Sequence, residues 1–250
     1  MQKASAAISL VNDLRQSSAP VVLAHDRTLP VVDELADLFS GKGLKQGSTT
    51  EVRGTAAVSL AVALTVGITR SEGWVVAVGL PELGSSAAYD LGVQFRRWAF
   101  VDQPEDQAGE VIHALMGAVD LILVGPEVRL RASHGRKIAA RMRERGTSIV
   151  TVGDAGRCNL QPSLRLRVNR TEWTGLGHGY GRLTSSKVEI ELVNRGADSS
   201  PHRQLFWLPD GEGRLSVVDQ DNEWTSQSEF CSRDKQKILA DLDKQIPWAS

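Results

Sequence analysis

The residues best placed for chemistry lie where a strand, a glycine and a helix follow one another. The pattern predicts a strand over Ser48–Arg53, then Gly54, then a helix over Ala56–Val66 that is apolar on every face. A helix that begins behind a glycine offers free N–H groups and a positive dipole end to an anion. This junction therefore stands where a phosphate-binding P-loop would be found.

The residues at this junction do not complete a P-loop. The chemistry needs G-x-x-x-x-G-K-[ST], with the lysine on the phosphates and the hydroxyl on magnesium. Counted from Gly54, the corresponding positions hold Ser59, Leu60 and Ala61. Leu60 supplies no hydrogen-bond donor, so we expect a degenerate and inactive nucleotide site.

The carboxylate that would hold magnesium is also out of place. The strand predicted over Asp120–Val124 begins with its only carboxylate and is followed by Gly125. We interpret Asp120 as a turn residue at the start of that strand. Ser40–Gly43 precedes the first strand instead of following it, so we interpret it as a loop. We expect no catalytic residue, no metal and no cofactor.

The composition is that of an ordinary globular protein. The 250 residues are 41% hydrophobic and 24% charged, and the net charge is -1. This balance excludes a basic coat for nucleic acid, so any polyanion site must be local. Cys158 and Cys231 form no CxxC pair, which argues against a zinc or redox motif.

The sequence also shows no export or membrane signal. The apolar stretch near Met1 is too short for a signal peptide. The most apolar segment, Thr55–Ile68, is too short to span a bilayer and is interrupted by polar residues and glycine. We expect a cytoplasmic protein with no membrane contact.

The hydrophobic pattern predicts an α/β fold. Strands are predicted over Trp74–Gly79, Asp120–Val124 and Ser148–Val152, alternating with helices over Ser85–Leu91, Ala108–Met116 and Ser133–Arg145. Such apolar strands between helices indicate a mainly parallel sheet flanked by helices. After Gly153 shorter strands follow, which we expect to be antiparallel: Leu164–Val168, Lys187–Val193, Gln204–Leu208 and Arg214–Val218.

Three segments are expected along the chain. Residues 1–27 form an N-terminal helix and linker, residues 28–218 the core, and residues 219–250 an acidic linker and an amphipathic tail helix. The tail carries six apolar residues that are candidates for partner binding: Phe230, Ile238, Leu239, Leu242, Ile246 and Trp248. This stripe either packs on its own domain or docks in a partner's groove.

Basic residues are concentrated between Arg129 and Arg170. Five of them extend along the helix predicted over Ser133–Arg145, as expected for contacts with a phosphate backbone. The candidate residues for binding single-stranded DNA are Arg129, Arg131, Arg136, Lys137, Arg141, Arg143 and Arg145. The alternative is a solvated helix face that meets an acidic partner. No aromatic platform for bases accompanies these charges.

The order of elements resembles the RecA recombinase core. The local similarity is best from Val78 to Val124, where Leu91–Val93 and Gly117–Val124 follow the order and spacing of RecA. In that family a glutamate after the second strand activates the attacking water, and Leu80 stands at the matching position. The resemblance implies a RecA-like core, over residues 28–218, with degenerate nucleotide-binding motifs and without ATPase activity.

Within the RecA-like proteins, the sequence most resembles the actinobacterial ImuA′ family over roughly residues 28–210. The stretches that carry this resemblance are Gly43–Ser48, the Gly54 loop, Val78–Gly84 and Glu172–Arg182. The resemblance implies a non-catalytic adaptor of the mutasome, which acts in translesion DNA synthesis during the SOS response to DNA damage. Its implied partner is ImuB, an inactive Y-family-like polymerase.

The same resemblance implies indirect links to an error-prone replicative-type DNA polymerase and the sliding clamp, with RecA as a further candidate partner. It also implies association with the nucleoid during DNA damage. Two alternatives stay open: a DNA-dependent ATPase of the RecA class with an unorthodox P-loop, and a SulA-like inhibitor of cell division. Magnesium-dependent ATP turnover would favour the first, and binding to the tubulin-like division protein the second.

Overall fold

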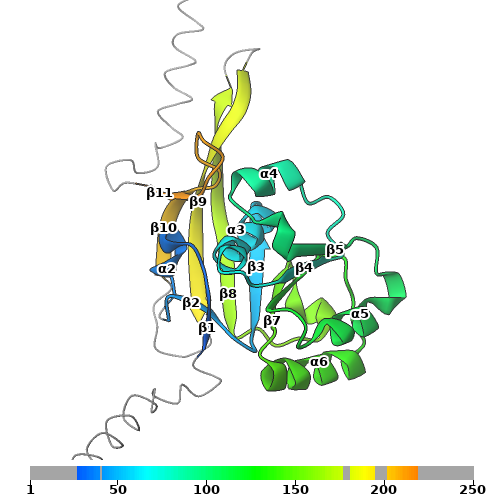
Figure 1. Ribbon diagram of the computed structural model, residues 1–250. Coiled ribbons are helices and arrows are strands. Elements are labelled where there is room, and N and C mark those ends of the chain that lie inside the picture. The colour runs from blue at the N-terminus through cyan, green and yellow to red at the C-terminus, as the bar shows by residue number, and fades with distance from the viewer. Residues whose placement is uncertain (1–26, 40, 177–180, 195–201, 219–250) are drawn as a thin grey trace, which may run out of the picture. The chain divides into compact units, whose positions relative to one another are not determined.

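The computed structural model describes residues 27–39, 41–176, 181–194 and 202–218 (Figure 1). By its internal contacts the chain divides into two units, Met1–Ser216 and Val217–Ser250, and the described residues belong to the first unit apart from Val217 and Val218. The helix and linker expected over residues 1–26 and the linker and tail helix expected over residues 219–250 lie outside the described residues.

A nine-stranded sheet, in the order β11-β10-β9-β8-β3-β7-β6-β4-β5, forms the centre of the fold. Its strands are β3 (Thr49–Gly54), β4 (Val75–Val78), β5 (Trp98–Val101), β6 (Leu121–Val124), β7 (Ser148–Val152), β8 (Leu164–Leu176), β9 (Gly181–Asn194), β10 (His202–Trp207) and β11 (Ser216–Val217). A separate antiparallel pair consists of β1 (Thr28–Pro30) and β2 (Gly43–Lys45).

The helices are α2 (Asp33–Ala36), α3 (Ala57–Arg70), α4 (Ser85–Asp90), α5 (Ala108–Leu115) and α6 (Ala132–Arg145). The described residues also form three short 3-10 helices, η2 (Phe95–Arg97), η3 (Glu105–Gln107) and η4 (Ala155–Cys158). No helix in the described ranges has both the length and the apolar character needed to cross a membrane.

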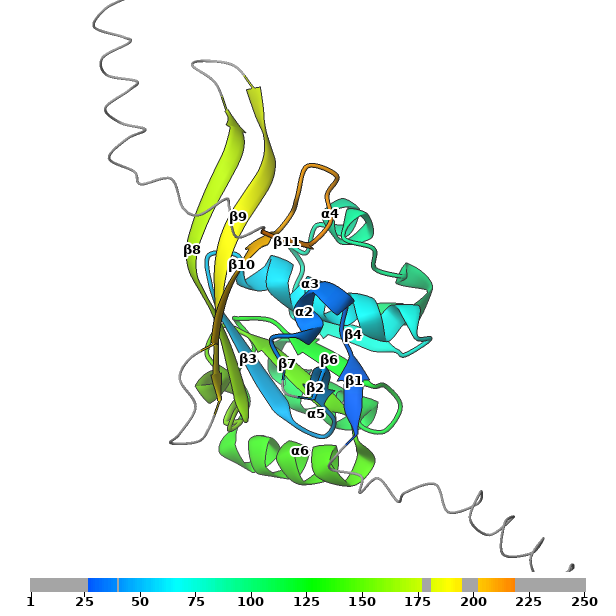
Figure 2. The same ribbon diagram turned by 90° about the vertical axis from the view of Figure 1, so that its left-hand side faces the viewer.

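Alternate residues of the parallel strands supply two hydrophobic cores. Val75 and Ala77 of β4 pack in the core that contains α3, whereas Val76 and Val78 face the core that contains α5 and α6. This alternation explains why β4 and β6 are apolar throughout and why every residue of β7 is buried, since both faces of these strands are covered. Figure 2 shows α3 and α6 on the two sides of the sheet.

The two cores do not extend equally across the sheet. The core around α3 reaches β8, β9 and β10, for example through Leu166, Ile190 and Phe206. The core around α5 and α6 includes no described residue from these three strands. Their second face instead carries charged side chains, including Arg165, Glu191 and Arg203.

The strands after Gly153 depart from the prediction in two ways. The pairs β8–β9 and β9–β10 are antiparallel as expected, but β8 runs parallel to β3 on its other side, so the expectation of purely antiparallel strands is wrong there. The hairpin of β8 and β9 is also much longer than predicted, and Figure 1 shows it rising beyond the helices. The two strands stay paired through residues whose side chains do not alternate between apolar and polar, so the hydrophobic pattern could not predict this part of the hairpin.

Candidate functional site

The carboxyl ends of β3, β4 and β6 form the edge of the sheet where α/β proteins usually bind ligands. At this edge only Thr55 and Ala56 separate Gly54, the last residue of β3, from the start of α3. A P-loop has several residues between strand and helix, and their N–H groups surround the phosphates. A connection of two residues is too short to form that cradle.

The residues counted as P-loop equivalents therefore lie inside the helix. The N–H of Leu60 donates to the carbonyl of Ala56 at 2.9 Å, an ordinary helical hydrogen bond. The side chains of Leu60 and Ala61 are 0% and 1% exposed and belong to the core around α3. Ser59 is half-buried on the same turn. The side chains of Leu60 and Ala61 therefore pack against the protein interior and offer nothing to a phosphate.

Strand β8 further closes the space beside Gly54. This residue has a φ of +113°, and a Cβ atom placed on it would lie 2.2 Å from the carbonyl oxygen of Val168. Glycine is required because no other residue combines this backbone conformation with so close an approach. Its role here is to let β3 and β8 approach, which differs from the role of a P-loop glycine.

Leu80 and Gly125 close the neighbouring strand ends. Leu80 is 6% exposed and packs in the core around α3, so the position matching the water-activating glutamate of RecA is apolar and buried. A Cβ on Gly125 would lie 1.7 Å from the carbonyl oxygen of Gly79, which brings the ends of β4 and β6 into direct contact. Asp120 lies at the opposite end of β6, where its carboxylate accepts a hydrogen bond of 2.8 Å from the N–H of Trp74.

A buried carboxylate that the sequence reasoning missed lies near this edge. Glu51, 2% exposed on β3, accepts hydrogen bonds from Arg53 (2.9 Å), Arg165 (3.1 Å) and the backbone N–H of Ala155 (2.9 Å). Arg53 also contacts Asp154 at 2.8 Å. The hydrogen bond with Glu51 raises the pKa of Arg53 above its ordinary value. The signal in the sequence is a glutamate within an otherwise buried strand, which requires partners.

A second carboxylate is held in a similar way on the charged face of β9. Glu191, 6% exposed, accepts hydrogen bonds from Asn169 at 3.1 Å and from Arg203 at 2.9 and 3.0 Å. The hydrogen bond from Asn169, with that from Arg203, lowers the pKa of Glu191. Both carboxylates are neutralised by neighbouring groups, and the described residues contain no cluster of three or more metal-ligating side chains. We interpret both networks as structural.

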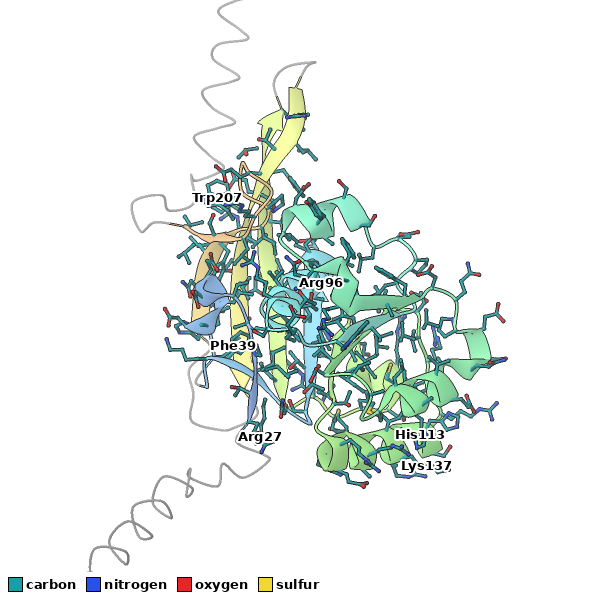
Figure 3. All side chains as sticks on the ribbon, in the orientation of Figure 1. Arg27, Phe39, Arg96, His113, Lys137 and Trp207 are labelled. Atoms are coloured by element: carbon teal, nitrogen blue, oxygen red, sulfur yellow. The ribbon has the colours of Figure 1, made fainter. Side chains whose placement is uncertain are left out.

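The seven basic residues predicted to bind DNA are split between different surfaces. Arg129 and Arg131 are exposed in the segment before α6. Lys137 and Arg141 face α5: Lys137 lines a small cleft beside His113, and Arg141 lies 3.4 Å from the Nε2 atom of His113. Figure 3 shows Lys137 and His113 together, away from Arg27.

The other three, Arg136, Arg143 and Arg145, line a cleft of about 910 Å³ together with Arg27 and Lys45. We call this the basic cleft. It lies between α6, the turn that joins β2 to β3, and residues 159–163 before β8. Arg27 and Lys45 were missed because they are more than 80 residues from α6 in the sequence and show no local signal.

The six apolar tail residues proposed for partner binding, from Phe230 to Trp248, lie outside the described residues, as does His178. The hairpin of β8 and β9 does expose three large apolar side chains: Trp173, Leu176 and Leu183 are 49%, 67% and 48% exposed. The sequence reasoning did not single out these exposed apolar residues.

Comparison of the sequence with known proteins gives two matches. Residues 37–157 match the model of the MT3502 N-terminal domain family. The chain is 32% identical over 98 residues to the uncharacterised protein Rv3395c of Mycobacterium tuberculosis, a match that covers 38% of this chain. It spans about half, 48%, of that relative's length.

The crystal structure of the flagellar accessory protein FlaH from Methanocaldococcus jannaschii is also similar. It superposes with a TM-score of 0.54 at 14% identity, and the match covers 77% of this chain and 100% of that chain. At this identity the similarity concerns the fold alone, and it confirms the α/β, RecA-like architecture expected from the sequence.

Proposed function

We propose that this protein is a nucleotide-independent adaptor of the mutasome, which binds ImuB and supports error-prone translesion DNA synthesis. The observation that carries the proposal is the closed end of β3. A RecA-like scaffold in which β3 joins α3 through Thr55 and Ala56 alone has no loop between them in which to hold a triphosphate.

The energetics of the site support the absence of nucleotide chemistry. In a P-loop the lysine provides a charge-assisted hydrogen bond, an interaction worth roughly 1.5–3 kcal/mol, and the loop N–H groups provide several more. Here Leu60 and Leu80 contribute their side chains to the core instead. These positions therefore stabilise the fold, which is compatible with a protein that functions through its surfaces and not through a reaction.

The DNA-damage context rests on the resemblance to the ImuA′ family, and the mycobacterial relative is compatible with it. In this proposal ImuB is the direct partner, and the error-prone replicative-type polymerase and the sliding clamp are reached through ImuB. The apolar residues of the tail and the exposed apolar side chains of the β8–β9 hairpin are the candidates for that contact.

Titration calorimetry of the purified protein with ATP and magnesium tests the nucleotide part of the proposal. We expect no binding heat, and no ATP turnover when single-stranded DNA is added. Saturable binding of ATP, or turnover stimulated by DNA, would instead support the alternative of an ATPase with an unorthodox P-loop.

A further inference from the structure

The basic cleft concentrates positive charge on a protein whose net charge is only -1. Five cationic side chains and one carboxylate, that of Glu144, line it. They come from three separate stretches of chain: Arg27 before β1, Lys45 at the end of β2, and Arg136, Arg143 and Arg145 on α6. Residues so far apart in sequence converge on one surface only because the fold brings them there.

Four of these cations have no acidic partner within the part of the chain that the structure describes. Arg145 alone is paired, with its Nε atom 3.7 Å from Glu144, whereas Arg27, Lys45, Arg136 and Arg143 form no ion pair. Elsewhere in the protein arginines are neutralised, as Arg53 and Arg165 are by Glu51 and Arg203 is by Glu191. Unpaired cations repel one another, so their convergence costs free energy unless an anion binds.

The carboxyl end of α6 accounts for only part of this charge. The helix ends at Arg145, followed by Gly146 in the left-handed conformation, and its dipole places about half a negative charge there. Arg143 and Arg145, in the last turn, complement that dipole. Arg27, Lys45 and Arg136 do not belong to the last turn, so the cleft retains an excess of positive charge.

The remaining lining favours contact with phosphates over contact with bases. Several polar side chains are already used internally: Ser48 donates to the carbonyl of Lys45 at 2.6 Å, Asn159 to that of Leu130 at 2.6 Å, and Ser163 to that of Thr49 at 3.1 Å. No aromatic side chain is among the lining residues, so the cleft offers no surface on which a base could stack.

We propose that the basic cleft binds the phosphate backbone of a nucleic-acid strand without reading its sequence. Cations that come from several elements suit an extended chain of phosphates better than one isolated anion. Of the seven residues predicted from the sequence to bind DNA, this proposal keeps Arg136, Arg143 and Arg145. It adds Arg27 and Lys45, which no helical pattern could reveal.

The cleft is separate from the degenerate nucleotide site. Its lining includes Ser48 and Thr49 at the amino end of β3, whereas Gly54 marks the carboxyl end of the same strand. At about 3.3 Å per residue, the two edges are about 17 Å apart. Binding at the cleft therefore requires neither nucleotide nor ImuB, and it stands or falls independently of the proposed adaptor function.

Fluorescence anisotropy with a labelled oligo-dT strand and the full-length protein tests the proposal. If all five cations neutralise phosphates, affinity should fall about 100-fold as salt rises from about 50 mM to about 200 mM, because each contact adds about 0.7 to the logarithmic salt slope. The double variant Arg136→Glu/Arg143→Glu removes two contacts and adds repulsion. We expect it to bind at least about tenfold more weakly at low salt, with a shallower salt dependence.

A matched control carries the same change of net charge outside the cleft. Arg129→Glu/Lys137→Glu alters two exposed cations, one of them adjacent in sequence to Arg136 but facing α5. We expect this control to bind within about twofold of wild type at a given salt concentration. Circular dichroism establishes that both variants are folded.

Three results would overturn the proposal. One is no binding of wild-type protein to the strand at low salt, and another is equal loss in the two double variants, which would indicate an effect of overall charge. The third is displacement of the strand by inorganic phosphate at constant ionic strength, which would indicate a site for a small anion.

Discussion

Leu60→Lys places the missing P-loop lysine at the position where the motif count requires it. If α3 were the helix of an unorthodox nucleotide site, this substitution should create or strengthen ATP binding. In the structure the Leu60 side chain is fully buried in the core around α3, so the lysine would replace a core residue. We expect severe destabilisation and no gain of ATP binding.

The magnitude follows from two contributions. Loss of a fully buried leucine side chain costs roughly 1.5–3 kcal/mol, and burial of an unpaired ammonium adds several kcal/mol more. The position lies in the first turns of α3, where the positive end of the helix dipole further disfavours a cation. A total of at least about 4 kcal/mol should lower the melting temperature by about 8–16 °C.

Thermal unfolding followed by circular dichroism, with and without ATP and magnesium, measures this effect. Val58→Lys is the matched control, because Val58 lies on the same turn with 39% of its surface exposed. We expect the control to change stability by no more than about 0.5 kcal/mol. A Leu60→Lys protein that melts at the wild-type temperature and is stabilised by ATP would refute the reasoning.

Three further predictions concern buried ionisable groups. Glu51→Ala leaves the N–H of Ala155 without its acceptor, whereas Arg53 and Arg165 are nearly half exposed and can be rehydrated, so we expect a loss of about 2–3 kcal/mol in the free energy of unfolding measured with urea. The control is Glu189→Ala, which removes a carboxylate with no ion pair among the described residues and should cost under about 0.5 kcal/mol. Equal losses in the two variants would contradict this interpretation. Burial raises the pKa of the Cys158 thiol to about 11. In a Cys231→Ser protein this thiol should therefore resist alkylation at about pH 8 until denaturant is added. Rapid alkylation of the folded protein would show instead that the thiol is accessible. Hydrogen bonds lower the pKa of Glu191 from 4.5, so the carboxylate stabilises the fold above that pH, and this contribution is lost as the pH falls below it. The difference in unfolding free energy between wild type and Glu191→Gln should therefore become smaller in acid. A difference that stays constant with pH would argue against the ion pair.

The sequence predicted β4, β6 and β7 well because these strands are mainly apolar and are buried on both faces. Ser148–Val152 matches β7 residue for residue, and α6 begins one residue before the predicted Ser133. It failed where backbone pairing, and not side-chain pattern, defines a strand. In the second half of β8, over Arg170–Leu176, the pairing with β9 shifts register at Gly175, which has a φ of +100°. A glycine at such a bulge resembles a loop residue when only the sequence is known.

The candidate sites show the same limit. The absence of a P-loop lysine could be seen directly, but the two-residue connection that closes the site depends on where α3 begins. The basic helix was also visible, and helical spacing puts Arg136 and Lys137 about 100° apart, but only the fold shows which elements these two faces meet. Arg27 and Lys45 join the cleft through tertiary contacts between β2, β3 and α6. Such long-range convergence has no signature in one sequence.

Co-purification of the full-length chain with ImuB, in the absence of nucleotide, tests the adaptor proposal most directly. We expect a stable complex whose yield does not change when ATP and magnesium are added. Failure to form a complex, or a complex that forms only with ATP, would contradict the proposal. Retention of the tubulin-like division protein in place of ImuB would favour the division inhibitor instead.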